Sequence, residues 1–333
     1  MRCFFDERQF AHAPSQELHN GAFVPSMETR ARVESILAAI GATEPVIDHG
    51  EGPLRAVHSE AYLAFLWSAY KDWRSDGRPG DAAGYVWPAV RRRPLRLDRI
   101  DALLGLHSID AATPIASGTW ESAYWAAQTA LTALDSLLGG ESSAFALCRP
   151  PGHHCGSDYL GGYCYLNNAA IAAQAARSAG RRAAILDVDY HHGNGTQDIF
   201  YEDGDMLFVS IHADPVVDYP FFWGHADEKG DGAGEGATLN LPLPRGANFD
   251  AYLPALDQGL QTIADFGADL IVCSYGADTY VGDPISYFAL ETGDYAPMAR
   301  RIASLGVPTL TVMEGGYAVD ALGANVAAFL SGF

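Results

Sequence analysis

Short apolar segments alternate with helix-like stretches through the middle and C-terminal parts of the sequence. We expect buried strands at 144–147, 183–188, 207–211, 270–274 and 307–313. The helices between them are expected at 122–138, at 167–179 and around 295–305. Apolar strands that alternate with helices are typical of a mostly parallel sheet covered by helices on both faces. The sequence therefore predicts an α/β fold.

The length of the chain suits a single large domain. Its 333 residues can bury a sizeable core, and we expect one domain over 1–333. Residues 70–120 differ from the rest because they combine glycines and prolines with the basic run Arg91-Arg92-Arg93-Pro94. We interpret them as a long loop insertion, since such loops usually serve function or assembly. The basic run is interpreted as a solvated or interface charge cluster, with an anion site as the alternative.

The overall charge excludes one broad class of function. With 21 Lys and Arg against 41 Asp and Glu, the formal net charge is −20, whereas a general nucleic-acid binder needs a basic surface. The longest apolar runs are far too short to span a bilayer, and Asp6 interrupts the N-terminus before a signal-peptide core develops. We expect a cytoplasmic protein that binds neither nucleic acid nor membrane. Its acidity weakly suits a cationic ligand.

Two adjacent histidines follow the first predicted strand. The segment Arg149-Pro150-Pro151-Gly152-His153-His154 places them in a loop stiffened by proline, which is unusual for a packed core. Histidine is the natural side chain for proton transfer near neutral pH. A single histidine is most often structural, but two in a rigid loop after a strand indicate function.

Carboxylates and a histidine alternate where another predicted strand ends. Asp187, Asp189 and His191 share one face of an extended chain, and Asp278 also follows an apolar strand. Together, Asp189, His191 and Asp278 would leave one coordination position open for water, as in catalytic zinc sites. The alternative is a surface strand end with ordinary salt bridges, which the apolar residues before Asp187 disfavour.

A pair of glycines precedes a tyrosine after the last predicted strand. In Met313-Glu314-Gly315-Gly316-Tyr317 the glycines allow a sharp turn and a close approach to a ligand. The hydroxyl of Tyr317 can donate a hydrogen bond to an oxyanion that develops during a reaction. Alone, this motif is weak evidence, and it gains weight from the segments before it.

Together the four segments resemble the histone deacetylase and acetylpolyamine amidohydrolase superfamily, with the greatest similarity to bacterial acetylpolyamine amidohydrolases. Their order along the chain is RPPGHH, DVDYHHGNG, GADTY and EGGY. Weaker similarities lie at 57–63, 113–121, 161–164, 209–212 and 283–286. The resemblance implies an arginase–deacetylase fold, in which helices flank both faces of a central, mostly parallel sheet.

The resemblance also implies two kinds of bound metal. It assigns Asp189, His191 and Asp278 as the ligands of one catalytic zinc ion. Members of the family also carry a structural potassium ion. Its predicted ligands are Asp187 and main-chain oxygens near Asp189, His191, Ser210 and Ile211.

The resemblance gives the remaining polar residues catalytic roles. His154 is expected to act as general base and then general acid, and His153 as its electrostatic partner, oriented by Asp187. Tyr317 is expected to stabilise the oxyanion. Many relatives support the second histidine with a carboxylate, whereas this sequence has Asn194 at that position. The amide would leave His154 less strongly biased towards its charged form.

Several further residues match positions around the substrate in the family. Tyr163 and Tyr219 match residues that line the acyl-lysine tunnel, and Gly161 and Gly162 are expected to shape the same channel. Arg32 matches an arginine near an internal exit for acetate. These assignments follow from the resemblance alone.

The expected activity is zinc-dependent removal of acetyl groups from N-acetylated amines, above all acetylpolyamines or small acetylated diamines. Acidic residues at the mouth of the site are expected to bind the distant ammonium, and Asp101 and Asp110 are the candidates. A glutamate position of the subgroup falls on Ala112, which weakens the expectation of polyamine specificity. In relatives the insertion forms a dimer interface, so a homodimer through 70–120 is expected.

Three alternatives remain open. Acetyl-lysine peptides or other N-acyl amides are alternative substrates of the same chemistry. A binuclear manganese hydrolase of the arginase type would need further carboxylates where this sequence has Tyr280 and Gly193. A non-catalytic acyl-ligand binding protein would be favoured by loss of a metal ligand, the histidine pair or the tyrosine, all of which are present.

Overall fold

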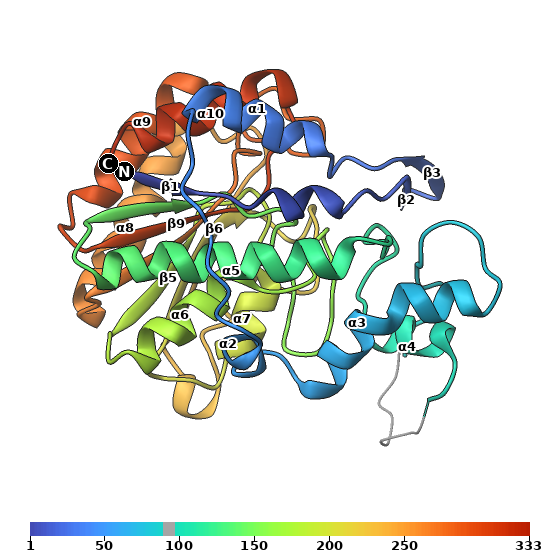
Figure 1. The fold of residues 1–333 in the computed structure, drawn as a ribbon. Coiled ribbons are helices and arrows are strands. Elements are labelled where there is room, and N and C mark those ends of the chain that lie inside the picture. Colours follow the sequence, from blue (N-terminus) through green and yellow to red (C-terminus); the bar gives the residue numbers. More distant parts are fainter. Residues whose placement is uncertain (89–96) are drawn as a thin grey trace.

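A seven-stranded sheet forms the centre of the computed structural model, which describes residues 1–88 and 97–333 (Figure 1). Every neighbouring pair of its strands is parallel. In spatial order the strands are β1 (Arg2–Phe4), β4 (Ser143–Ala146), β9 (Thr309–Met313), β8 (Leu270–Tyr275), β5 (Ala183–Asp187), β6 (Leu207–Ala213) and β7 (Thr238–Leu243).

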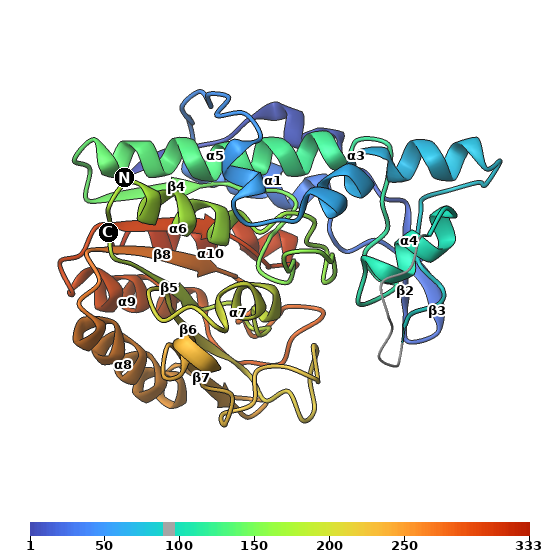
Figure 2. The ribbon, with the colours of Figure 1, turned by 90° about the horizontal axis from the view of Figure 1, so that it is seen from below.

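Helices cover both faces of this sheet (Figures 1 and 2). On one face lie α5 (Thr119–Leu138) and α6 (Asn168–Ser178). The other face is covered by α1 (Arg30–Ile40), α8 (Phe249–Phe266), α9 (Thr292–Ala303) and α10 (Val319–Leu330). Among the helices of residues 1–88 and 97–333, none combines the length and the apolar character needed to cross a bilayer.

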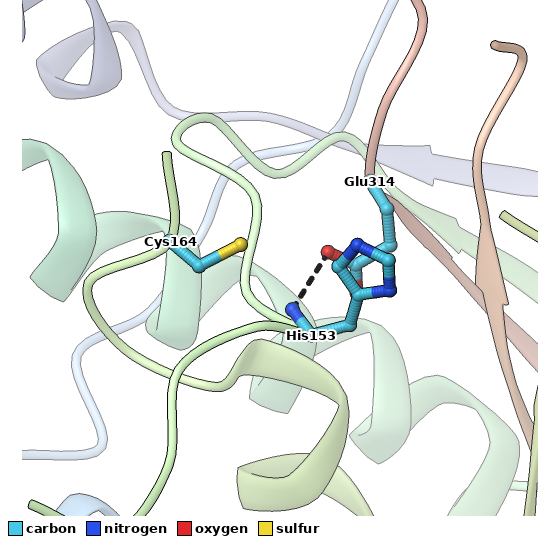
Figure 3. A group of neighbouring side chains, drawn as sticks. All are labelled: His153, Cys164 and Glu314. Atoms are coloured by element: carbon cyan, nitrogen blue, oxygen red, sulfur yellow. Dashed lines mark hydrogen bonds between the residues drawn. The ribbon is translucent and has the colours of Figure 1, made fainter. Parts of the chain in front are cut away.

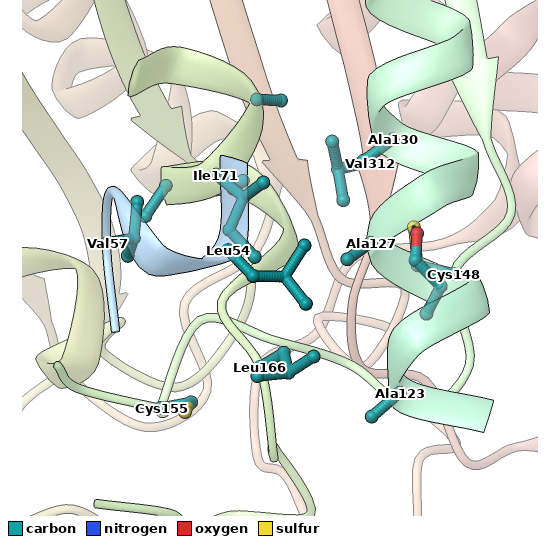
Figure 4. Close-up of a cluster of buried hydrophobic side chains, with 14 of the residues drawn as sticks. Leu54, Val57, Ala123, Ala127, Ala130, Cys148, Cys155, Leu166, Ile171 and Val312 are labelled. Atoms are coloured by element: carbon teal, nitrogen blue, oxygen red, sulfur yellow. The ribbon is translucent and has the colours of Figure 1, made fainter. Parts of the chain in front are cut away.

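The core consists of two hydrophobic clusters, one on each side of the sheet, because side chains alternate along a strand. In β4, Ala144 and Ala146 join the cluster beneath α5 and α6, whereas Phe145 belongs to the opposite cluster. Figure 4 shows part of the first cluster, where Leu54 and Ile171 lie across from Ala127 of α5. Strands buried on both faces explain the near-continuous apolar runs in the sequence.

The predicted elements of the sheet are confirmed. The five expected strands correspond to β4, β5, β6, β8 and β9, with ends that differ by one or two residues. The three expected helices correspond to α5, α6 and α9, whose ends differ by up to three residues. Asn167 begins α6 because its side chain accepts a hydrogen bond from the amide of Ala170, and Gly180 follows its end with a positive φ of 84°.

Other elements were not predicted. They include the edge strands β1 and β7 and an antiparallel hairpin of β2 (Gln16–His19) and β3 (Ala22–Pro25). The turn of the hairpin is Asn20-Gly21, with φ of 49° and 82°, as a two-residue hairpin turn requires. The helices α1, α8 and α10 were not predicted either. The same holds for α2 (Gly52–Arg55), α3 (Glu60–Ser75), α4 (Ile100–Leu106) and α7 (Asn194–Phe200), and for single 3-10 turns at Glu7–Ala11 and Gly232–Gly234.

The expected insertion at 70–120 contains regular structure. It holds the end of α3 and all of α4, and α5 begins at its far end. Together with the β2–β3 hairpin, α3 and α4 extend beyond the sheet (Figure 1). The basic run at 91–94 lies outside the described residues.

Candidate metal centre and active site

The chemically active residues follow four neighbouring strands at the same edge of the sheet. His153 and His154 come after β4, Tyr317 after β9, Asp278 after β8 and Asp189 after β5. Because adjacent parallel strands end side by side, the loops that follow them converge, and ligands bind at this edge in open α/β sheets. The structure therefore brings together residues that lie more than 160 positions apart.

Asp189, His191 and Asp278 form a cluster in which one ligand atom from each lies within 4.8 Å of the others. His191 Nδ1 is 3.1 Å from Asp278 Oδ2 and 3.4 Å from Asp189 Oδ1. Both carboxylates are buried, and the histidine is nearly so. One imidazole and two carboxylates are a donor set that zinc accepts.

Backbone amides fix the orientation of the two carboxylates. The amide of Gly315 donates to Asp189 Oδ2 over 2.8 Å, and the amide of Tyr190 donates to Asp278 Oδ1 over 3.0 Å. The close approach requires glycine, since a Cβ at Gly315 would lie 2.4 Å from Asp278 Oδ2. These contacts leave one oxygen of Asp278 and His191 Nδ1 directed at each other.

The charge of the cluster also suits a cation. Burial and the neighbouring Asp189 raise the pKa of Asp278 to about 7. Burying two carboxylates this close together is costly unless a positive charge compensates them. The residues therefore fit a divalent metal ion, and the expected zinc ligands are the residues that would hold it.

The adjacent histidines have opposite charge states. His153 Nδ1 lies 3.0 Å from Asp187 Oδ2, and although burial opposes protonation, Asp187 and Asp189 raise the pKa of His153 to about 10. His154 Nδ1 lies 2.7 Å from Asn194 Oδ1, which can only accept, so Nδ1 carries the proton. Burial and the charge of His153 lower the pKa of His154 well below 6.5. His154 is thus a neutral base beside a cation.

The loop that presents Tyr317 is held from two sides. Asp283 Oδ2 accepts hydrogen bonds from the amides of Tyr317 and Ala318, at 2.7 and 3.2 Å. Arg32 Nε donates to the carbonyl of Gly316 over 2.6 Å, and its guanidinium lies 4.7 Å from the centre of the Tyr317 ring. Burial raises the pKa of Tyr317 well above 10, so its hydroxyl keeps its proton.

A second group of potential ligands, His153, Cys164 and Glu314, lies beneath the histidine loop (Figure 3). Glu314 Oε2 accepts hydrogen bonds from the amides of Gly152 and His153, at 2.7 and 3.1 Å, and Oε1 accepts from Ser274. The carboxylate is therefore already used to fix the backbone of the histidine loop. Burial raises the pKa of Glu314 to about 7.

A cavity of about 250 Å³ leads to these residues. Tyr163 and Tyr219 form two of its walls: the Tyr219 ring lies 5.0 Å from that of His154, and the Tyr163 ring 5.6 Å from that of Tyr317. Tyr163 has a φ of 66°, which is strained for a tyrosine, and its hydroxyl donates to Glu17 Oε1 over 2.7 Å. The hairpin that carries Glu17 thus contributes to the entrance.

The other predicted residues are placed in different ways. Asp110, Gly162 and Ala112 line the cavity. Asp101 does not line it, and its carboxylate forms ion pairs with Arg78 and Arg99.

The potassium prediction involves residues on two neighbouring strands. Asp187 and Ser210 are register partners of β5 and β6, with Ile211 next to Ser210. Both Asp187 and Ser210 are fully buried. This arrangement is compatible with the predicted ligands, and the potassium site itself stays a prediction.

Sequence reasoning missed several residues that shape the site. Glu17, Thr113, Asp283 and Glu314 all hold a catalytic or cavity-lining residue in place. The Asn-Gly turn after β2 could have located the hairpin that carries Glu17. The other three form contacts between distant segments, which leave no local signal.

Comparison with known proteins gives consistent matches over the full length. The histone deacetylase domain family matches residues 26–333. Acetylpolyamine amidohydrolase 1 of Pseudomonas aeruginosa is 49% identical over 342 aligned positions, which cover 100% of this chain and 99% of that protein. The acetylpolyamine amidohydrolase of Mycoplana ramosa is 46% identical, with coverage of 100% and 99%.

A solved structure shows the same architecture. The crystal structure of acetylpolyamine aminohydrolase from Burkholderia pseudomallei matches with a TM-score of 0.96 at 39% identity, covering 100% of this chain and 98% of that one. The predicted arginase–deacetylase fold and the resemblance drawn from the four motifs are confirmed. From its family match and its full-length relatives, the chain belongs to the histone deacetylase family.

Proposed function

We propose that this protein is a zinc-dependent amidohydrolase that removes acetyl groups from N-acetylated amines. The observation that carries the proposal is the convergence of Asp189, His191 and Asp278 beside a neutral histidine and a protonated tyrosine. Family membership and relatives named as acetylpolyamine amidohydrolases support the same reaction. Of these groups, His154, His191 and Tyr317 line one cavity.

Each group has a defined task in amide hydrolysis. A zinc ion held by Asp189, His191 and Asp278 would supply Lewis acidity towards the amide carbonyl and an attacking water. His154 takes the proton from that water, since its Nδ1–H is bound to Asn194 and its Nε2 is free to accept. His153, held protonated by Asp187, places a positive charge beside the developing negative charge.

The final steps use the same residues. As the carbonyl oxygen becomes an oxyanion, the hydroxyl of Tyr317 donates a hydrogen bond to it. The C–N bond then breaks, and His154 delivers its proton to the leaving amine nitrogen. The products are acetate and a free amine, and His154 returns to its neutral form. Arg32 and Asp283 keep Tyr317 in position throughout.

The substrate class we propose is a small, cationic acetylated amine. A cavity of about 250 Å³ suits a slender chain, and the aromatic side chains of Phe221 and Tyr287 are among those that line it. Asp110 also lines the cavity, and within the described part of the chain no lysine or arginine forms an ion pair with it. Its negative charge therefore favours a substrate that carries an ammonium group.

A substrate panel tests the proposal. Zinc-loaded protein is compared on acetylputrescine, acetylcadaverine, acetylspermidine, an acetyl-lysine peptide and a neutral N-alkyl acetamide by kcat/KM. We expect kcat/KM for the small cationic amines to exceed that for the neutral amide by at least about tenfold, equivalent to about 1.4 kcal/mol. Preference for the peptide would replace the substrate class by acetyl-lysine. Binding without turnover of any amide would favour the non-catalytic alternative.

We also propose a homodimer that assembles through the region at 70–120, in a cytoplasmic protein that retains a structural potassium ion. Large apolar side chains are exposed in and beside this region: Trp67, Tyr85, Val86 and Leu106. Burial of such side chains is a usual feature of subunit interfaces. Analytical ultracentrifugation tests the assembly, and a monomer at micromolar concentration would contradict it.

A further inference from the structure

Asp110 lies at a junction between two walls of the cavity. Its Oδ2 accepts a hydrogen bond from the hydroxyl of Tyr219 over 2.8 Å and another from the amide of Gly162 over 2.7 Å. Tyr219 and Gly162 are 57 positions apart in the sequence and belong to separate loops. One oxygen atom therefore ties these two loops together.

The second oxygen of Asp110 fixes the carboxylate itself. Oδ1 accepts from the amide of Ala112 over 2.9 Å and from the hydroxyl of Thr113 over 2.8 Å. The same Thr113 hydroxyl accepts a hydrogen bond from the amide of Tyr163 over 3.0 Å. A carboxylate has about four lone-pair positions, so Asp110 has used its accepting capacity within the protein. The negative charge of Asp110 can still attract a cationic substrate in the cavity, but its carboxylate has no lone pair left to accept a hydrogen bond from that substrate.

The loops that Asp110 joins face the catalytic base. A Cβ at Gly162 would lie 2.1 Å from His154 Cδ2, and the ring of Tyr219 lies 5.0 Å from the ring of His154. The Tyr219 ring is also 6.2 Å from the ring of the predicted zinc ligand His191. Gly162 and Tyr219 line the same cavity as His154, so a substrate that reaches His154 through this cavity passes both of them. The separation of Gly162 and Tyr219 thus limits the width of that substrate.

We propose that the Asp110–Tyr219 hydrogen bond, here called the latch, fixes the distance between Tyr219 and Gly162 across the cavity. This distance makes the enzyme select unbranched amine chains. This rests on the proposed function. Tyr219 lies in the segment after β6 and is half-buried, and its hydroxyl donates to the same Asp110 oxygen that accepts from the amide of Gly162. Loss of the hydroxyl removes the bond that holds the ring against the Gly162 loop.

The test compares two substrates of equal charge that differ only in width. They are acetylcadaverine and an analogue with a methyl branch on the second carbon from the amide nitrogen. In Tyr219→Phe we expect the ratio of kcat/KM, branched over linear, to rise about tenfold, which is the usual effect of one methyl group in an apolar pocket. The gain should appear in KM, because the latch does not touch the reacting atoms.

Asp110→Asn gives a second variant of nearly the same shape. Asparagine has one accepting oxygen where Asp110 has two, so its NH2 group must meet either the donors Tyr219 and Gly162 or the donors Ala112 and Thr113. Either orientation breaks one side of the junction, so the ratio should rise. Since both variants weaken the same junction, the double variant should show no rise beyond that of Asp110→Asn. If the Asp110→Asn protein does not fold, the kcat/KM ratio of Tyr219→Phe alone tests the proposal.

A matched control is Tyr124→Phe. Tyr124 on α5 also donates its hydroxyl to an aspartate, Asp48, but does not line the cavity. We expect its ratio to equal that of the wild type. An active Tyr219→Phe variant with a ratio within twofold of the wild type overturns the latch and leaves the proposed function intact. A wild type that hydrolyses no acetylated amine overturns the proposed function, and the latch with it.

Discussion

The floor of the cavity and its entrance are built in different ways. The floor residues follow four adjacent strands, are buried, and are oriented by backbone amides and glycines, as at Asp189 and Asp278. The entrance comes from separate segments that are joined by side-chain hydrogen bonds, such as that of Tyr219 with Asp110. The floor is thus set by the sheet and the entrance by loop contacts. We expect changes in the floor to lower the rate for every amide and changes at the entrance to alter selectivity.

The largest effect is expected at the floor. Tyr317→Phe removes one donor to the oxyanion, which should lower kcat by about 10²- to 10³-fold. The reduction should be similar for linear and branched, cationic and neutral acetamides, because the oxyanion is common to all. Steady-state kinetics on the substrate panel measure it. Unchanged turnover would remove Tyr317 from the mechanism, and a loss confined to one substrate would contradict the division between floor and entrance.

The second-largest effect is expected on the pH dependence of kcat/KM, which the general base His154 controls. His154 must be neutral to accept a proton, and its depressed pKa keeps it neutral down to well below pH 6.5. Asn194→Asp places a carboxylate 2.7 Å from Nδ1 and should raise that pKa by about one unit or more. The acidic limb of the kcat/KM profile should therefore move to higher pH for every substrate.

The control for this variant is Asn248→Asp, at the exposed N-terminus of α8. It introduces the same change of side chain far from the histidines and should leave the pH profile in place. An acidic limb that does not move in Asn194→Asp would show that a group other than His154 controls it.

The smallest effect is expected at the entrance. Arg245 and Asp218 both line the cavity, and they form a bidentate pair with distances of 2.9 and 2.7 Å. Asp218→Asn leaves the arginine charge uncompensated, so it should repel a cationic substrate. We expect kcat/KM for acetylputrescine to fall about three- to tenfold, and less at high salt, with little change for a neutral acetamide.

Asp257→Asn is the matched control for this change. Asp257 forms a similar bidentate pair with Arg301 on the surface, with both distances 2.6 Å. Equal losses on cationic and neutral amides in Asp218→Asn would mean that the entrance does not discriminate by charge.

The floor of the site could be predicted from the sequence because each of its residues lies within a few positions of a buried strand. Asp189 and His191 follow the apolar run of β5, and His154 follows β4, so short motifs carried the information. The strands themselves were visible as apolar runs because both faces of the sheet are covered. The edge strands β1 and β7 lacked such a run and were not predicted.

The entrance could be predicted only in part, since its contacts join distant segments. The bond from Tyr163 to Glu17 spans 146 positions, and the bond from Tyr219 to Asp110 spans 109. No periodicity or spacing records such pairs. Asp101 illustrates the same limit: it was expected to meet a substrate ammonium, yet the structure pairs it with Arg78 and Arg99.

The central claim is that Asp189, His191 and Asp278 hold one zinc ion that amide hydrolysis requires. The most direct test is a zinc titration of chelator-treated protein, with bound metal and acetate release from acetylputrescine measured on the same samples. The account predicts no turnover without metal and a linear rise that ends at one zinc per chain. Full turnover by the metal-free protein, or one bound zinc per chain without acetate release, would contradict it.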